Sequence, residues 1–430
     1  MIAQFKWFVM AVVLVLTACS QPKTDTEAAK PTDEVAKPTD EAAKPTDEAA
    51  KPTDEAILQA NWSKAEAKWT DALALGQFWM AQNRYDEVLR LFYEAETKFG
   101  STPEIQTAYA DALAKHPDLH ATPRELIVGK DITGMKRLGG GSSLIYRFYK
   151  DKQIIAAFKP FQKRFQSNYR SEIAAYRLCP AMKCGFDVPM NIPVYFDFDV
   201  FSSLYARNAA NPKEEFKEII PTKLENGKYR VNGTYKAWIP DFADYPIEFT
   251  EIWKPWLNPG TPKAELQMPA QTLLPKIAQK HARGDKFAKK LMPHLENLSV
   301  YGLARQISNL IVFDFLINNW DRFSGADELK GINCQIAHGR FMSIDNGASF
   351  SQTPHAKPQK HLHEISRFSR MTYEAIKNFN KEEMKDYLFP NANEFEIQKF
   401  ETFWSQRQAY LDYVELCISK NGNDETFFFE

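Results

Sequence analysis

The stretch from Leu303 to Phe350 constrains the fold more than any other part of the sequence. Its first part, Leu303 to Phe315, has apolar residues at helical spacing and predicts a buried helix that places Asp321 at its C-terminal end. Two short apolar segments follow, Ile332 to Ile336 and Arg340 to Ile344, and the glycine-containing turn between them predicts a hairpin. The stretch is therefore expected to form a helix, a loop and a hairpin in that order.

Polar side chains stand at both ends of this unit. Asp321 follows the helix, Asp345 follows the second strand in Asp-Asn-Gly, and Asn333 lies between them. Two carboxylates and an amide in this order match the base and the metal ligands of a phosphoryl-transfer site. A helix C-cap followed by an Asx turn explains the same residues without any function, because Asp-Asn-Gly is ordinary turn chemistry. The rest of the chain must decide between these two interpretations.

The N-terminus is predicted to be a targeting segment. Lys6 precedes an apolar run from Trp7 to Leu16 that is too short for a permanent membrane span. Leu-Thr-Ala-Cys19 then resembles the lipobox of bacterial lipoproteins, which implies cleavage before Cys19 and acylation of its thiol. An uncleaved anchor, or a cysteine that stands there by chance, is the alternative. Ser20 is similar to an outer-membrane sorting signal, so we expect a lipid-anchored protein of the bacterial cell envelope that faces the periplasm or the exterior.

Residues 20–56, which follow the predicted signal peptide at 1–19, form a segment of low complexity. Lys-Pro-Thr-Asp-Glu occurs four times in it, starting at Lys30, Lys37, Lys44 and Lys51. Prolines at this spacing prevent a long helix, and almost no residue here is able to contribute to a core. The sequence therefore predicts a disordered tether.

Residues 57–122 are predicted to be helical. One amphipathic element runs from Trp62 to Trp79, and a second from Tyr85 to Phe99 ends at a glycine. The pattern resembles a tetratricopeptide unit, with Gly76 where the two helices would pack closely. One such unit cannot bury its own apolar faces, so it is expected to pack on the domain that follows. It is either an arm that binds a protein partner or a helical support, and we favour the support.

The charge balance gives no indication of nucleic-acid binding. Lys and Arg total 54 against 55 Asp and Glu, a net charge of -1. The eight histidines show no tight ligand spacing except His361 and His363, which lie in a polar segment. A transition-metal site is therefore not indicated.

A glycine run and a β-hairpin are predicted next. Gly140 and Gly141 lie in a Gly-Gly-Gly-Ser-Ser loop before two extended segments, Leu144 to Tyr149 and Gln153 to Phe158. Glycines here would let backbone N–H groups approach a phosphate, although such runs are usually plain loops. The second segment ends at Lys159, which is expected either to be solvated or to contact nucleotide phosphates.

Glu172 favours the second interpretation of Lys159. It lies in the first turn of a predicted helix that starts near Ser171, an N-cap candidate. A carboxylate in this place pairs with a strand lysine in kinases and holds it toward the nucleotide. We therefore expect Lys159 and Glu172 to form an ion pair.

A family resemblance now becomes clear from five motifs that occur in the family's order. They are Phe-Lys-Pro at 158–160, Glu-Ile-Ala-Ala-Tyr-Arg-Leu at 172–178, Val-Pro at 188–189, Asn-Trp-Asp-Arg at 319–322 and Ile-Asp-Asn-Gly at 344–347. Over Leu138 to Phe350 the chain resembles the secreted kinases of the Golgi casein kinase, glycosaminoglycan xylosyl kinase and four-jointed group. The resemblance implies an α+β, two-lobed protein-kinase-like fold, with a small β-rich N-lobe at 123–235 and a helical C-lobe at 236–425.

The resemblance also implies a role for each matching residue. Lys159 would contact the nucleotide phosphates and Glu172 would hold it. Asp321 would accept the proton of the attacking hydroxyl, and Asp345 would hold the divalent metal. Phe323 departs from the family, in which Asp-Arg-His is usual, and this leaves the contacts around the catalytic loop open.

Two further site expectations concern the adenine and the metal. The segment 233–240 is similar to the connection between the two lobes, where Ala237 and Trp238 would meet the adenine. Asn333 is expected from the residues alone to be a second metal ligand, because carboxylate and amide oxygens suit Mg²⁺ or Mn²⁺. The implied cofactor is thus ATP with Mg²⁺ or Mn²⁺.

The cysteines are consistent with an oxidising compartment. Apart from Cys19 there are four, and an even number in an exported chain permits two disulfides. We expect a local bridge, Cys179–Cys184, and a bridge from the hairpin to the C-terminal helices, Cys334–Cys417. Four buried free thiols are the alternative.

The sequence therefore predicts an exported, metal-dependent kinase. It would transfer the γ-phosphate of ATP to a hydroxyl of a protein or glycan acceptor in the cell envelope. Because the periplasm is not known for ATP, two alternatives stay open: a catalytically silent kinase-fold scaffold that binds envelope partners, and a kinase-fold nucleotidyl transferase.

Overall fold

The computed structural model describes residues 53–139, 143–164, 167–206, 216–323 and 333–429. These residues belong to one unit, Pro52–Glu430. The expectations for the signal peptide, Cys19, the tether up to residue 52, Gly140 and Gly141 lie outside the described residues. Within the described ranges, no helix is both long enough and apolar enough to cross a membrane.

Four helices open the described chain, as the sequence predicted for this segment. They are α1 (Asp54–Trp62), α2 (Trp69–Ala81), α3 (Tyr85–Phe99) and α4 (Pro103–Lys115). The expectation of one continuous helix from Trp62 to Trp79 is wrong, because Ser63 caps the first helix and the chain turns before the second begins. The segment shares its apolar core with α5 and the helical lobe. Tyr109 on α4 also donates to the carbonyl of Pro180 at 2.7 Å.

Close packing of α2 against α3 depends on Gly76. A Cβ atom added there would lie 2.3 Å from Cζ of Phe92. Gly76→Ala is therefore expected to lower the free energy of unfolding by about 1–3 kcal/mol, because the ring of Phe92 is fully buried and has to move. Urea unfolding measures the change. Gly139→Ala is the matched control, since an added Cβ meets nothing within 4 Å there. Equal stability of the two variants would contradict the proposed contact.

The N-lobe is a seven-stranded sheet with two helices. Its strand order is β1-β5-β7-β4-β3-β2, with β6 paired to β7, and only β1 and β5 run parallel. The elements are β1 (Arg124–Glu125), β2 (Gly134–Arg137), β3 (Tyr146–Lys150), β4 (Gln153–Pro160), α5 (Tyr169–Ala181), β5 (Asn191–Asp197), α6 (Phe198–Ala206), β6 (Thr222–Lys223) and β7 (Tyr229–Ala237). The predicted hairpin is confirmed as the antiparallel pair β3 and β4.

Side chains along the central strands alternate between the two faces of the sheet, and those on one face form the core of this lobe. Phe148 on β3, Phe158 on β4 and Phe196 on β5 are all fully buried on one face of the sheet. The rings of Phe148 and Phe158 stack with their centroids 5.1 Å apart, and Phe201 of α6 packs against the ring of Phe158. This core fixes the register of β4 and therefore the position of Lys159 at its end.

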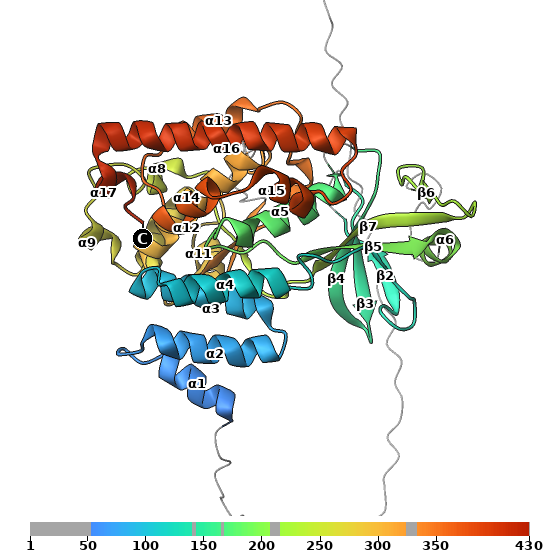
Figure 1. Cartoon of the computed structure of the whole chain (residues 1–430), viewed down its shortest axis with the longest axis horizontal. Coiled ribbons are helices and arrows are strands. Elements are labelled where there is room, and N and C mark those ends of the chain that lie inside the picture. The colour runs from blue at the N-terminus through green and yellow to red at the C-terminus, as the bar shows by residue number, and fades with distance from the viewer. Residues whose placement is uncertain (1–52, 140–142, 165–166, 207–215, 324–332, 430) are drawn as a thin grey trace, which may run out of the picture. The chain divides into compact units, whose positions relative to one another are not determined.

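The helical lobe contains the predicted helix and hairpin. Its elements are β8 (Ala243–Asp244), α8 (Thr250–Trp253), α9 (Lys263–Leu266), η2 (Ala270–Leu273), α10 (Leu274–Lys280), α11 (Gly284–Leu291), η3 (Met292–Leu295), α12 (Val300–Leu316), β9 (Cys334–Ala337), β10 (Arg340–Ser343), η4 (Asn346–Ala348), α13 (Ala356–His363), α14 (Arg370–Lys377), α15 (Lys381–Leu388), α16 (Glu394–Asn421) and α17 (Asn423–Thr426). Helix α12 is buried along nearly its whole length, and the long helix α16 packs on it (Figure 1). Strands β10, β9 and β8 form a second, small sheet. The predicted α+β architecture, a β-rich lobe followed by a helical lobe, is confirmed.

The aromatic C-terminus closes the helical lobe. Phe427 and Phe429 are buried, and the N–H of Phe429 donates to the carbonyl of Phe368 at 3.2 Å. The guanidinium of Arg367 lies 3.7 Å from the ring centroid of Phe428. These contacts attach the last residues to the segment between α13 and α14, so the aromatic run has a structural role that its sequence did not reveal.

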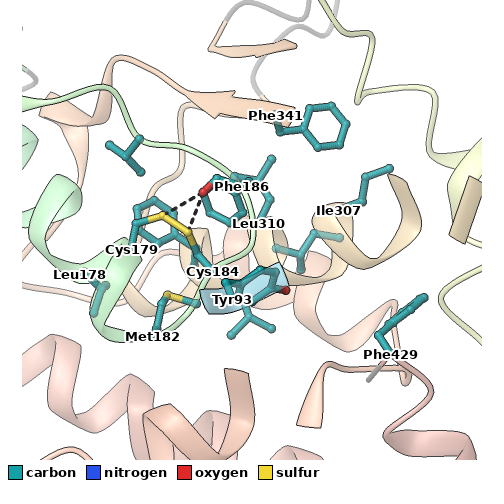
Figure 2. Close-up of a cluster of buried hydrophobic side chains, with 14 of the residues drawn as sticks. Tyr93, Leu178, Cys179, Met182, Cys184, Phe186, Ile307, Leu310, Phe341 and Phe429 are labelled. Atoms are coloured by element: carbon teal, nitrogen blue, oxygen red, sulfur yellow. Dashed lines mark hydrogen bonds between the residues drawn. A yellow bond between two sulfur atoms is a disulfide. The ribbon is translucent and has the colours of Figure 1, made fainter. Parts of the chain in front are cut away.

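One of the two expected disulfides is present. Cys179 and Cys184 are bonded, and Figure 2 shows the bridge within a cluster of buried side chains that includes Tyr93 and Leu310. The expected Cys334–Cys417 bridge is wrong: both residues are buried, unpaired cysteines. Cys334 lies inside the small sheet, where its carbonyl accepts from Tyr245. Cys417 lies near the end of α16 beside Tyr413. The two cysteines are therefore buried on different elements, Cys334 on β9 and Cys417 on α16, and do not meet.

Candidate active site

Lys159 is the centre of a buried ionic cluster. Its side chain is 5% exposed, and Nζ donates to Oε1 of Glu172 at 2.7 Å and to Oδ1 of Asp345 at 2.6 Å. The three residues come from β4, from α5 and from the turn after β10, so this is a contact between distant parts of the chain. The structure therefore brings together three of the residues that the sequence indicated.

The local structure explains how Glu172 and Asp345 reach this lysine. Helix α5 begins after Asn168, whose side chain accepts from two backbone N–H groups, so the expected N-cap at Ser171 is wrong by one turn. Glu172 lies in the first turn, and its Oε2 accepts from the N–H of Asn346 at 3.0 Å. Asp345 has φ 54° and ψ 54°, a left-handed conformation that aspartate tolerates better than most residues.

A second lysine contacts the same glutamate. Nζ of Lys236, on β7, donates to Oε2 of Glu172 at 3.3 Å. The register pairs Lys236 with Ala157, two positions before Lys159, so both lysines point to one side of the sheet. Lys236 was not among the site residues predicted from the sequence. Only the pairing of β4 with β7 places it in the site, although its position just before the lobe connection is a signal.

These contacts shift the pKa values of the cluster. Burial raises the pKa of Glu172, but the charges of Lys159 and Lys236 and the hydrogen bonds outweigh it and lower that pKa to about 2. Burial likewise lowers the pKa of Lys159, and the charges of Asp345 and Glu172 raise it above its usual value instead. Both side chains are therefore charged at neutral pH.

The lowered pKa of Glu172 predicts a pH dependence of stability. Its contribution is fully present above its unfolded pKa of 4.5 and is lost as the pH falls through its folded pKa of about 2. We expect Glu172→Gln to lower the free energy of unfolding at pH 7 by roughly a few kcal/mol. The difference from the wild type should shrink as the pH falls from 4.5 towards 2.

Urea unfolding at a series of pH values measures this difference. Glu66→Gln is the control, because Glu66 is an exposed glutamate outside the cluster. A constant difference between wild type and Glu172→Gln across this pH range would contradict the proposed ionic role.

Asp321 and Asn333 contact each other across the segment that separates them in sequence. Nδ2 of Asn333 donates to Oδ2 of Asp321 at 2.9 Å. The N–H of Asp321 donates to Oδ1 of Asn319 at 3.1 Å, which fixes the backbone at the end of α12. The predicted base and the predicted second metal ligand therefore lie side by side.

A buried ion pair between Arg322 and Asp314 stabilises the segment that carries Asp321. Nε of Arg322 donates to Oδ2 of Asp314 at 3.0 Å, and both side chains are almost completely buried. The same guanidinium donates to the carbonyl oxygens of Asn333 and Ile344, and to Oδ1 of Asn346 at 2.9 Å. The sequence analysis missed this network. An aspartate inside an otherwise apolar helix, with an arginine soon after it, was the available signal.

A cavity of about 480 Å³ lies between the lobes beside the cluster. Ala237 and Trp238, the residues expected to meet the adenine, line it together with Lys236, Asn333 and Asp345. Strand β7 continues to Ala237, and the N–H of Ala237 donates to the carbonyl of Met190 at 3.0 Å. Residues 233–237 are therefore strand, and the connection between the lobes starts at Trp238. Gly139, the first residue of the glycine run, lines the same cavity.

The residues around the cavity fit a divalent metal that arrives with a nucleotide. Among the described residues, no group of three or more His, Cys, Asp or Glu side chains is arranged to hold a metal on its own. Mg²⁺ does not require one, because it usually takes one or two carboxylates and completes its shell with phosphates and water. The Asp345 side chain, 40% exposed at the cavity, and the amide of Asn333 are hard oxygen donors of this kind.

Comparison with known proteins gives a distant structural likeness. No protein-family model and no curated protein matches the chain. A crystal structure of the Golgi casein kinase is similar at a TM-score of 0.40 and 14% identity, covering 75% of this chain and 79% of that chain. The Golgi casein kinase with Mn/ADP bound is similar at a TM-score of 0.38 and 14% identity, covering 87% and 88%. At this distance the likeness assigns no function to this chain.

Proposed function

We propose that this chain is an exported, lipid-anchored kinase that transfers the γ-phosphate of ATP to a hydroxyl group. One observation carries the proposal. Nζ of Lys159 lies 2.7 Å from Glu172 and 2.6 Å from Asp345, and Asp345 lines a cavity between a sheet lobe and a helical lobe. A strand lysine held by a helix glutamate, facing a metal-binding aspartate, is what phosphoryl transfer requires for neutralising phosphate charge.

Each residue has a separate part in the reaction. Lys159 binds the phosphates of ATP, and Glu172 keeps its ammonium group in place. Asp321 accepts the proton of the acceptor hydroxyl, and Asn333 orients the carboxylate through its hydrogen bond. Asp345 and Asn333 would hold Mg²⁺ or Mn²⁺, which when bound supplies positive charge against the phosphate oxygens.

The proposed location follows from the first residues of the sequence. The lipobox before Cys19 would place a lipid anchor on the chain, and the repeats would separate the folded unit from the membrane. The acceptor would then be a protein or glycan of the bacterial cell envelope.

Nucleotide binding and product labelling test the proposal together. ATP with Mn²⁺ should raise the unfolding temperature of the purified chain, by an amount that corresponds to about 2.7 kcal/mol at a hundred times Kd. In the Asp345→Ala variant, the part of this rise in unfolding temperature that depends on Mn²⁺ should be absent. Label from the γ-phosphate, but not from the α-phosphate, should appear on isolated envelope fractions.

The other outcomes discriminate between the alternatives. Transfer of label from the α-phosphate would mean a nucleotidyl transferase. No metal-dependent stabilisation by ATP would instead favour a silent scaffold that binds envelope partners. Either result would overturn the kinase proposal.

A further inference from the structure

Two adjoining cavities lie beside α5. They are separate from the cavity between the lobes in which we propose that ATP binds, called the nucleotide cavity below. Their volumes are about 320 and 470 Å³. Tyr169 and Arg170 of α5 and Arg230 of β7 border both, so they form one continuous hollow. Residues 388–391, just before α16, close one side of the first cavity. This hollow shares no lining residue with the nucleotide cavity.

Arg177 of α5 brings a buried positive charge to this hollow. It is 3% exposed, and among the described residues its guanidinium donates to two carbonyl oxygens, those of Tyr387 at 3.1 Å and Ala121 at 3.3 Å. Its Nε is buried without a hydrogen-bond partner among the described residues. A charge removed from water in this way is costly unless an anion compensates for it.

The side chains near Arg177 increase this excess of positive charge. Burial is the main cause that lowers the pKa of Arg177; Tyr387 acts against it, and the positive charge of Arg170 lowers that pKa further. Arg230 lies with its guanidinium 4.9 Å from the ring centroid of Tyr195, and its Nε is also buried without a partner among the described residues. Arg170 forms an ion pair with Glu396. None of the described carboxylates forms an ion pair with Arg177 or Arg230.

We propose that this hollow is a binding site for a small anion of the phosphate class, held by Arg177 and Arg230 with Arg170 at its edge. Guanidinium groups match the oxygens of phosphate in a forked, two-point geometry, which makes arginine the preferred residue for such ligands. A cavity of about 320 Å³ has room for more than one phosphoryl group, since a water molecule in the liquid takes roughly 30 Å³. Inorganic diphosphate and phosphorylated small molecules share this chemistry.

The site would act on phosphoryl transfer through α5. Arg170 and Arg177 lie on the same helix as Glu172, on a face turned away from it by more than 100° at about 3.6 residues per turn. An anion that holds these arginines would stabilise α5 in the position where Glu172 contacts Lys159. This consequence rests on the proposed function, whereas the binding itself does not.

Binding of inorganic diphosphate to the full chain tests the site directly. The measurement is made without divalent metal, by calorimetric titration and thermal unfolding, on the wild type and on the Lys159→Met variant, so that binding in the nucleotide cavity shows as a difference between the two. We expect saturable binding of one equivalent. Arg230→Gln should weaken it about tenfold or more, because a charge-assisted contact is removed, whereas exposed Arg283→Gln should not change it.

Each outcome decides for or against the site. Arg177→Gln should weaken binding as Arg230→Gln does, and Arg230, which is less buried, keeps the test valid if the first variant fails to fold. Absence of saturable binding, or equal affinity in Arg230→Gln and Arg283→Gln, would overturn the proposal. Titration with inorganic phosphate and with diphosphate distinguishes a site for one phosphoryl group from a site for two. Since no ATP turnover is measured, failure here is separate from failure of the proposed kinase activity.

Discussion

Asp321→Asn is expected to lower kcat for phosphoryl transfer by about 10²–10⁴-fold, because it removes the proposed proton acceptor. The amide has the same shape as the carboxylate and keeps one oxygen that can accept from Asn333. In the wild type, Nδ2 of Asn333 lies 2.9 Å from Oδ2 of Asp321. KM for ATP and the unfolding temperature should therefore change little. Initial rates with γ-labelled ATP, measured beside circular-dichroism melting curves, separate loss of chemistry from loss of fold.

The control for Asp321→Asn is the same substitution at an exposed aspartate. Asp285, in the first turn of α11, is solvent-exposed and far in sequence from the loop. Asp285→Asn should keep full activity. If Asp321→Asn retained more than about a tenth of the wild-type rate, proton transfer to this carboxylate would not be part of the mechanism.

The site residues found from the sequence share one property, which is their position at the end of an element. Lys159 closes a strand, Glu172 opens a helix, and Asp345 follows a strand. Periodicity marks where elements end, so polar residues at those points stand out against the apolar pattern. Their distance from one another in space was not predictable from the pattern. The pairing of Lys159 with Glu172 was expected from their places at a strand end and in a first helical turn, whereas Asp345 was assigned a role beside them only by the family resemblance. The structure gives contacts of 2.7 and 2.6 Å.

The residues that sequence analysis missed are positioned by pairing between elements. Lys236 lies within a strand and enters the site only because β7 pairs with β4. Cys334 and Cys417 led to an expected bridge that does not exist, because the number of cysteines says nothing about which of them meet. Asp314 and Arg322 are close in sequence, yet their pairing depends on how the chain turns after α12. Which of these residues contact one another is decided by how elements distant in the sequence pack together, and a local sequence pattern does not contain this.

Breaking the pair between Arg322 and Asp314 is expected to have the largest effect on stability. Arg322→Met would leave the carboxylate of Asp314, which is 2% exposed, without its counter-charge, and would release the carbonyls of Asn333 and Ile344. Removing one partner of a buried ion pair typically costs 3–5 kcal/mol, so we expect the free energy of unfolding to fall by about that amount. Urea unfolding measures the change, with Arg283→Met as the control at an exposed site.

The double variant Asp314→Leu/Arg322→Met shows whether the pair itself or the packing is lost. Because two apolar side chains leave no buried charge, the double variant should be more stable than Arg322→Met alone. Additive losses would contradict a direct ionic interaction. Activity should stay low in the double variant even where stability returns, since Asn333 and Asp345 lose the guanidinium that holds their backbone segments. Recovery of the fold without recovery of phosphoryl transfer would assign Arg322 a positioning role in the proposed reaction, separate from its contribution to stability.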